Sequence, residues 1–268
     1  MKQILGVLAL WLISSSTVLG QYQEIHTKHF FKGYPAGTPE SNDLIIRDLY
    51  SLSNNDETKF ADWVAYRIDT LTMSGNDMPR NWKSDPWLHE SETLEKDDYD
   101  DAHAILKTDR GHLAPLGSLD GNQNYFETNY LSNITPQKTN LNQGPWKVLE
   151  RFERDIITTH KLSNYIIVYT GTLYEREMET MPRADESAKV PSGYWKIIIV
   201  PKADNQFDTA AFIFDQDTPR NVSPIDSLVT IDEIEERSGL DFFWELENIE
   251  ENQLEAMSNS SWISPLLD

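Results

Sequence analysis

Four apolar runs constrain the fold of this chain most strongly. Residues 60–70 (FADWVAYRIDT) alternate apolar and polar side chains, as a strand with one buried face does. Residues 165–170 (YIIVYT) and 194–200 (YWKIIIV) are rich in β-branched and aromatic residues and are bounded by Gly and Pro, which is typical of buried strands. Residues 210–214 (AAFIF) form a further expected strand.

Two helices are expected among these strands. One spans about residues 142–161, where apolar side chains recur on one face and Pro145 lies either in the first turn or at a kink. The other spans residues 231–238, with Thr230 as the N-cap and a glycine as the stop. The elements do not alternate as βαβ units. The sequence therefore predicts an α+β fold with a mainly antiparallel central sheet flanked by helices.

The chain is expected to hold one domain behind an export signal. Lys2, the apolar run at residues 4–13 and the small residues before Gln21 predict a cleaved signal peptide over residues 1–20. Residues 21–268 contain no linker or repeat, so they are expected to form one domain. No later segment is apolar over the length of a bilayer, and there is no cysteine. We expect a secreted or periplasmic protein that does not associate with membranes and is stabilised by its core.

Net charge argues at first against a nucleic-acid partner. The chain has 23 Lys and Arg against 44 Asp and Glu, a net charge of −21. Nucleic-acid-binding proteins usually carry a basic footprint, but a site depends on its local charges. An acidic, non-catalytic exported module that mimics DNA and binds a basic protein is therefore an alternative. An enzyme for small phosphodiesters is another.

Residues 107–115 (KTDRGHLAP) place a histidine beside an arginine. The ordinary pKa of a histidine, about 6.5, suits a general base at neutral pH, so His112 is a candidate for that role. Arg110 disfavours the charged imidazolium, which keeps the base neutral, and its guanidinium matches phosphate oxygens. Taken alone, this short motif fits a solvent-facing loop better than a catalytic site.

Residues 129–150 (NYLSNITPQKTNLNQGPWKVLE) add amide side chains and a carboxylate. Asn142 and Glu150 are eight residues apart, which is about 80° around a helix and roughly 12 Å along it. A cation held by Asn142 would reach Glu150 only through water, or if Pro145 bends the helix. Mg²⁺ suits this arrangement because it keeps several of its waters.

Several motifs in this order resemble one known family. The resemblance covers residues 50–243 and rests on WVAYRI near Trp63, RNWKSDP from Arg80, DRGHLAP from Asp109, the stretch over residues 129–150, YTGTLY near Gly171 and VPSGYWKIII from Val190. Together they resemble the DNA/RNA non-specific endonucleases of the ββα-metal (His-Me finger) fold. That family includes secreted bacterial sugar-non-specific nucleases and mitochondrial endonuclease G.

The resemblance implies a role for four residues on the two central motifs. His112 matches the general base that deprotonates the attacking water. Asn142 matches the one direct protein ligand of the metal ion. Glu150 matches the carboxylate that orients metal-bound water, and Asn133 matches a nearby active-site amide.

The resemblance also implies phosphate contacts and a reaction. Arg80 matches an arginine on the scissile phosphate, and Arg110 and Arg154 match further arginines of the cleft. Asp109 is expected to accept hydrogen bonds in its turn and not to bind metal. The expected reaction is hydrolysis of DNA and RNA to 5′-phosphate ends with little sequence or sugar selectivity. Mg²⁺ is the expected ion, with Mn²⁺ as an alternative. No protein partner is expected, and a homodimer is left open.

Overall fold

The computed structural model describes residues 22–76, 78–256 and 260–267. The signal peptide predicted over residues 1–20 lies outside them. Within the described part, no helix has both the length and the apolar character needed to cross a membrane.

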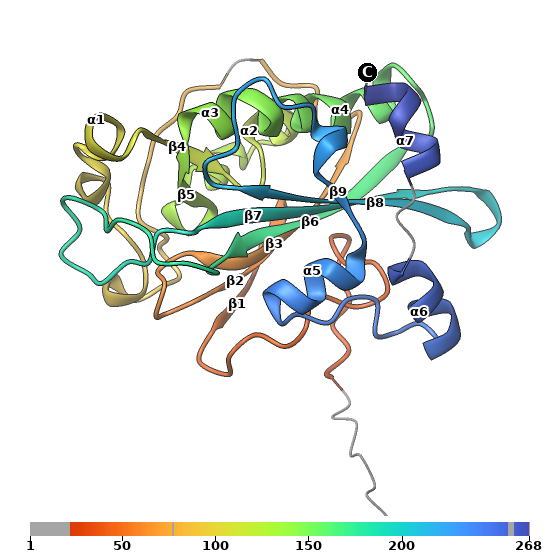
Figure 1. The fold of residues 1–268 in the computed structure, drawn as a ribbon, viewed down its shortest axis with the longest axis horizontal. Helices are drawn as coiled ribbons and strands as arrows, with labels where there is room; N and C mark the ends of the chain where they lie inside the picture. Colours follow the sequence, from red (N-terminus) through yellow and green to blue (C-terminus); the bar gives the residue numbers. More distant parts are fainter. Residues whose placement is uncertain (1–21, 77, 257–259, 268) are drawn as a thin grey trace, which may run out of the picture.

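A seven-stranded antiparallel sheet forms the centre of the molecule (Figure 1). In chain order its strands are β1 (Asp43–Ile46), β2 (Tyr50–Asn54), β3 (Ala61–Asp69), β6 (Tyr165–Leu173), β7 (Gly193–Pro201), β8 (Phe207–Asp215) and β9 (Leu228–Val229). Their order across the sheet is β1-β2-β3-β6-β7-β8-β9. The four strands expected from the sequence correspond to β3, β6, β7 and β8, so the expected α+β fold with an antiparallel sheet is confirmed.

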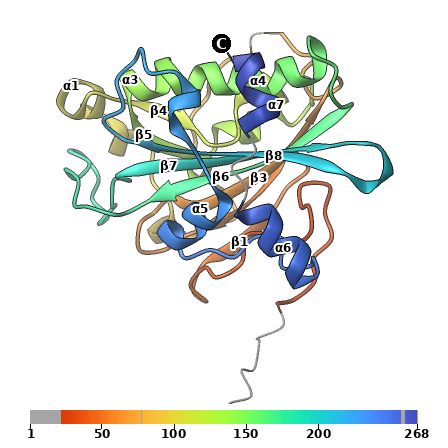
Figure 2. The ribbon, with the colours of Figure 1, turned by 45° about the vertical axis from the view of Figure 1, so that its right-hand side comes forward.

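Helices cover both faces of this sheet (Figures 1 and 2). They are α1 (Ala102–Leu106), α2 (Leu116–Leu119), α3 (Thr139–Leu141), α4 (Lys147–Thr158), α5 (Ile231–Ser238), α6 (Asn248–Glu255) and α7 (Ser260–Leu267). Helices α4 and α7 lie on one face, and α5 and α6 lie on the other. Short 3-10 turns occur at Glu90–Glu92, Asp97–Tyr99, Tyr125–Asn129, Leu131–Asn133, Ala203–Asn205 and Pro224–Ser227.

Alternation along the strands explains this layering. In β7, Tyr194, Ile198 and Val200 join the cluster under α4 and α7, whereas Trp195 and Ile197 join the cluster over α5. Successive side chains of a strand point to opposite faces, and each fully buried large apolar side chain contributes about 1.5–3 kcal/mol. Both faces of the central strands are therefore buried in the hydrophobic core, so β7 is held in place from both sides.

A separate two-stranded hairpin lies above the sheet, between it and the surface. It consists of β4 (Thr108–His112) and β5 (Ile134–Lys138), paired antiparallel from Thr108 with Lys138 to His112 with Ile134. Gln216, directly after β8, joins this hairpin to the large sheet. Its Nε2 donates to the carbonyl of Pro136 (3.0 Å), and its Oε1 accepts from the backbone N–H of Lys138 (2.8 Å).

The first expected helix is present but ends at Thr158, and of the two alternatives for Pro145 the kink is the one observed. A π-helical turn over Asn142–Trp146 precedes α4, and Gly144 has non-helical backbone angles (φ −108°, ψ −118°). A Cβ atom on Gly144 would lie 2.6 Å from the carbonyl oxygen of Arg220, so glycine permits this close approach. The kink changes the direction of the chain between Asn142 and Glu150.

The second expected helix has the predicted bounds. The Thr230 hydroxyl accepts a hydrogen bond from the backbone N–H of Glu233 (3.1 Å), and Gly239 ends the helix with φ of 74°.

Candidate active site

The hairpin places His112 at the end of β4, where the chain turns toward α2. Asn133 fixes this turn from behind. Its Oδ1 accepts from the backbone N–H of Ala114 (2.8 Å), and its Nδ2 donates to the carbonyls of Ala114 (3.0 Å) and Thr128 (2.8 Å). Because its amide is buried and already bonded, Asn133 does not line the cavity described below.

His112 is held as a neutral base. Its ring is almost buried, with 9% exposure, and its Nε2 lies 3.2 Å from Oδ1 of Asn129. An amide oxygen only accepts, so Nε2 carries the proton and Nδ1 keeps its lone pair. Burial lowers the pKa of His112 to about 4; the bond to Asn129 opposes this shift, and the charge of Arg80 adds to it. The ring is thus uncharged at neutral pH.

The side-chain amide of Asn142 is fixed by Asp109. The Nδ2 group of Asn142 donates to Oδ2 of Asp109 over 2.9 Å, and Gln143 and Thr139 also donate to this carboxylate, over 2.8 and 3.0 Å. Burial raises the pKa of Asp109, but these donors outweigh it and leave the pKa lowered. The expected role of Asp109 as a hydrogen-bond acceptor is confirmed. With Nδ2 committed in this way, Oδ1 of Asn142 is the atom available to a hard cation.

Glu150 lies in the first turn of α4, above a buried ion pair. Lys196 Nζ and Glu153 Oε1 are 2.5 Å apart with both side chains fully buried, and the Tyr66 hydroxyl donates to Glu153 Oε2 (2.9 Å). Burial raises the pKa of Glu150 to about 7; Lys196 lowers it and Glu153 raises it. The carboxyl of Glu150 therefore titrates close to neutral pH and gains from any cation placed beside it.

One cavity of about 700 Å³ brings these groups together. Its wall includes six of the seven predicted site residues, all except Asn133: Arg80, Arg110, His112, Asn142, Glu150 and Arg154. The ring of Trp82 lies 5.3 Å from that of His112, measured between centroids. The general base and the amide proposed to hold the metal thus open into the same space.

The arginines of the cavity differ in their contacts. Arg154 donates to the Ser118 hydroxyl (3.1 Å), and neither it nor Arg80 forms an ion pair with a described residue. The Nη2 group of Arg110 donates to the Lys96 carbonyl over 2.9 Å, and Asp100 lies 4.0 Å away. Arg80 and Arg154 are therefore the cations most available to a phosphate.

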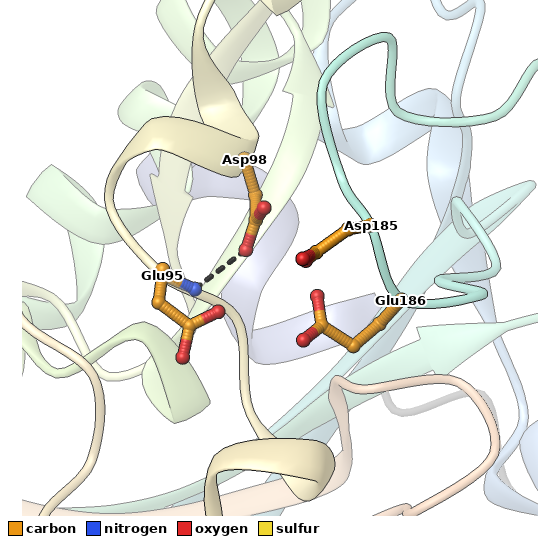
Figure 3. Close-up of side chains that lie close together, drawn as sticks. All are labelled: Glu95, Asp98, Asp185 and Glu186. Carbon is orange, nitrogen blue, oxygen red and sulfur yellow. Dashed lines mark hydrogen bonds between the residues drawn. The ribbon is translucent and has the colours of Figure 1, made fainter.

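Four carboxylates gather elsewhere: Glu95, Asp98, Asp185 and Glu186 (Figure 3). Asp98 accepts from the backbone N–H of Glu95 (2.6 Å), and Asp185 and Glu186 approach from the segment between β6 and β7. Burial, with the neighbouring carboxylates, raises the pKa of Glu95 to about 7. None of the four lines the cavity of His112, so they are separate from the metal position expected at Asn142.

Three residues of the site were missed in the sequence. Asn129 contacts His112 directly, although the sequence analysis singled out the neighbouring Asn133 and not Asn129. Lys196 and Glu153 form the buried pair under Glu150. A lone lysine in the apolar run at residues 194–200 was the available signal, because lysine is almost never fully buried unless it is paired.

Comparison with known proteins shows the family of the chain. The model of the DNA/RNA non-specific endonuclease family matches residues 28–248. The "Nuclease" of Serratia marcescens is 48% identical over 208 residues, which cover 78% of this chain and 77% of that protein. Mitochondrial endonuclease G of Bos taurus is 28% identical over 224 residues, covering 77% of this chain and 71% of that protein.

A solved structure shares the fold. The crystal structure of the EndoG/EndoGI complex, which concerns the mechanism of EndoG inhibition, aligns with a TM-score of 0.66 and 24% identity. The alignment covers 81% of this chain and 90% of that chain. The family match covers most of the chain and favours the enzymatic interpretation over an acidic binding module. The chain therefore belongs to the DNA/RNA non-specific endonuclease family and is a nuclease.

Proposed function

We propose that this nuclease is a Mg²⁺-dependent endonuclease that hydrolyses DNA and RNA with little sequence or sugar selectivity and leaves 5′-phosphate ends. One observation carries the proposal: the neutral imidazole of His112 and the anchored amide of Asn142 line one cavity with Arg80 and Arg154. Because the reacting group is a backbone phosphate, the base and the sugar contribute little to recognition.

His112 would act as the general base. Its Nδ1 lone pair can take a proton from water, while the bond from Nε2–H to Asn129 holds the ring in place. Arg80 would neutralise the scissile phosphate and so favour attack by that water. Arg110 lines the same cavity and would offer substrate the guanidinium N–H groups that its bond to Lys96 does not use. Asn133 would act by positioning the segment after His112.

The donor set fits a hydrated divalent cation. Asn142 would hold it directly through Oδ1, and Glu150 would hold it through water. Asn142 and Glu150 are hard oxygen donors, as Mg²⁺ and Mn²⁺ prefer, and so small a donor set suits an ion that keeps its waters. When bound, the ion stabilises the negative charge that develops on the leaving oxygen.

The decisive experiment is cleavage of plasmid DNA and of RNA with Mg²⁺ or EDTA. We expect cleavage of both with Mg²⁺ and none with EDTA. His112→Ala should lower turnover by about 10²–10⁴-fold while binding of a labelled strand is retained. His26→Ala, a solvent-exposed histidine, is the matched control. Full activity of His112→Ala would rule out the assigned base.

We also propose that the chain is exported after cleavage between Gly20 and Gln21. N-terminal sequencing of protein recovered outside the cytoplasm tests this. A mature chain that begins at Met1 would contradict it.

A further inference from the structure

A second cavity adjoins the catalytic one along α4. It measures about 380 Å³, and Gln143, Lys147 and Arg154 line both cavities. The second cavity continues past Arg151 and Arg220 to α7. A strand that enters the catalytic cavity therefore has a hollow of nucleotide size beside it.

Positive charge is concentrated in this second cavity. Four cations line it, Lys147, Arg151, Arg154 and Arg220, against the single carboxylate of Asp155. The whole chain has 23 basic and 44 acidic residues, so the local charge of this cavity is opposite in sign to the net charge of the chain. Clustered like charges repel one another unless an anion lies between them.

These cations are also available to a ligand. Lys147, Arg154 and Arg220 form no ion pair with any residue that the structure describes. Arg151 pairs with Asp155 over 3.4 Å, but its side chain is 78% exposed. An ion pair as exposed as this one contributes little, so phosphate can replace the carboxylate at small cost.

The wall between the cations is apolar. It is formed by Val148 and Phe152 of α4 and by Leu266 and Leu267 of α7. Val148 is 46% exposed, so its side chain is open to a ligand in this cavity. Basic groups around an apolar wall match a nucleotide, which joins an anionic phosphate to a flat base.

The spacing along α4 suits a strand backbone. Lys147, Arg151 and Arg154 are four and three residues apart and share one face of the helix. They extend over roughly 10 Å of the helix axis, whereas a strand of a duplex carries one phosphate per about 3.4 Å of rise. The row can therefore contact more than one phosphate.

We propose that this second cavity binds the nucleotide next to the scissile phosphate, with Arg151 and Arg220 contacting its phosphate and Val148 its base. The inference rests on the proposed nuclease site. It makes the enzyme prefer substrates that extend beyond the cleaved bond on this side.

The test compares Arg151→Gln/Arg220→Gln with a matched control, Lys32→Gln/Lys202→Gln. Each double variant removes two positive charges, one from an ion pair and one without a described partner. Lys32 and Lys202 line neither cavity. The first readout is KM and kcat, measured on a 20-nucleotide single strand and on a dinucleotide. The second is binding of the labelled 20-mer by variants that also carry His112→Ala, so that the strand is not cleaved.

We expect Arg151→Gln/Arg220→Gln to raise KM and Kd for the 20-mer about tenfold, and KM for the dinucleotide less than twofold, with kcat little changed. The slope of log Kd against log salt should fall by about 0.7, since the two arginines contact one phosphate and each phosphate neutralised on a single strand contributes about 0.7. The control should change these values less than twofold.

Equal effects of the two double variants, or equal effects on both substrates, would overturn the proposed nucleotide site in the second cavity. Cleavage by the wild type would still support the proposed nuclease function. If the wild type cleaves nothing, the binding arm alone decides. A 20-mer that binds equally to both variants refutes the site, and selective weakening supports it.

Discussion

The side-chain amide of Asn142 donates to the carboxylate of Asp109 over 2.9 Å, and this bond fixes which atom of Asn142 faces the cavity. Asp109 also receives hydrogen bonds from Gln143 and Thr139, so it organises the whole approach to α4. In this respect Asp109 acts through Asn142 and is a positioning residue.

Loss of this carboxylate should weaken metal binding. We expect Asp109→Ala to raise the Mg²⁺ concentration for half-maximal cleavage by about 10–100-fold, as loss of a residue that orients a ligand typically does. Activity should recover at high Mg²⁺. Asp100→Asn removes one exposed charge nearby and is the control. An unchanged Mg²⁺ requirement would show that Asn142 needs no such support.

The acid side of the pH profile should report Glu150 and not His112. The pKa of Glu150 is raised to about 7, whereas that of His112 is lowered to about 4, so on acidification Glu150 is protonated first. At limiting Mg²⁺ we expect cleavage to fall as pH drops through about 7. Higher Mg²⁺ should move this fall to lower pH, because a cation favours the carboxylate. A pH profile whose midpoint does not change with Mg²⁺ concentration would contradict this assignment.

The same two groups should act oppositely on stability in EDTA. For His112 the folded pKa of about 4 lies below the ordinary 6.5, so its contribution is complete above pH 6.5 and is lost as pH falls toward 4, by about 3 kcal/mol. For Glu150 the folded pKa lies above the ordinary 4.5, so its contribution is lost as pH rises toward 7.

Urea denaturation between pH 4.5 and 6.5 separates the two effects. Relative to wild type, His112→Asn should lose stability as pH rises, and Glu150→Gln should gain it. Parallel curves for all three proteins would mean that neither group is perturbed in the fold.

The buried pair of Lys196 and Glu153 should be fragile to single substitution. Glu153→Gln leaves a fully buried ammonium without its anion, which costs about 3–5 kcal/mol. The double variant Glu153→Leu/Lys196→Met removes both charges and should recover much of the stability. The free energy of unfolding in urea measures both. Equal losses for the single and double variants would show that packing, and not charge, dominates here.

Much of the sheet was predictable because local pattern dictates it. The alternation in β3 and the β-branched runs of β6 and β7 are local signals, as are the caps of α5 at Thr230 and Gly239. His112 and Asn142 were found through motifs that lie only thirty residues apart in the chain.

The features that the sequence did not predict depend on contacts between residues far apart in the chain. The kink at Gly144 depends on the backbone of Arg220, which lies far along the chain. The segment over residues 85–101 is rich in Asp and Glu, as an exposed loop would be, yet Asp85 is buried against Arg47 (2.5 Å). Local charge content does not reveal a distant partner.

The hairpin of β4 and β5 is not part of the seven-stranded sheet, and Gln216 is one of the few hydrogen-bonded links between them. Its opening does not require β3, β6 or β7 to separate, since local regions of a protein open with their own free energies. If heat opens this pair of strands first, turnover stops at a lower temperature than the one at which the core unfolds, and cooling restores turnover without refolding of the core.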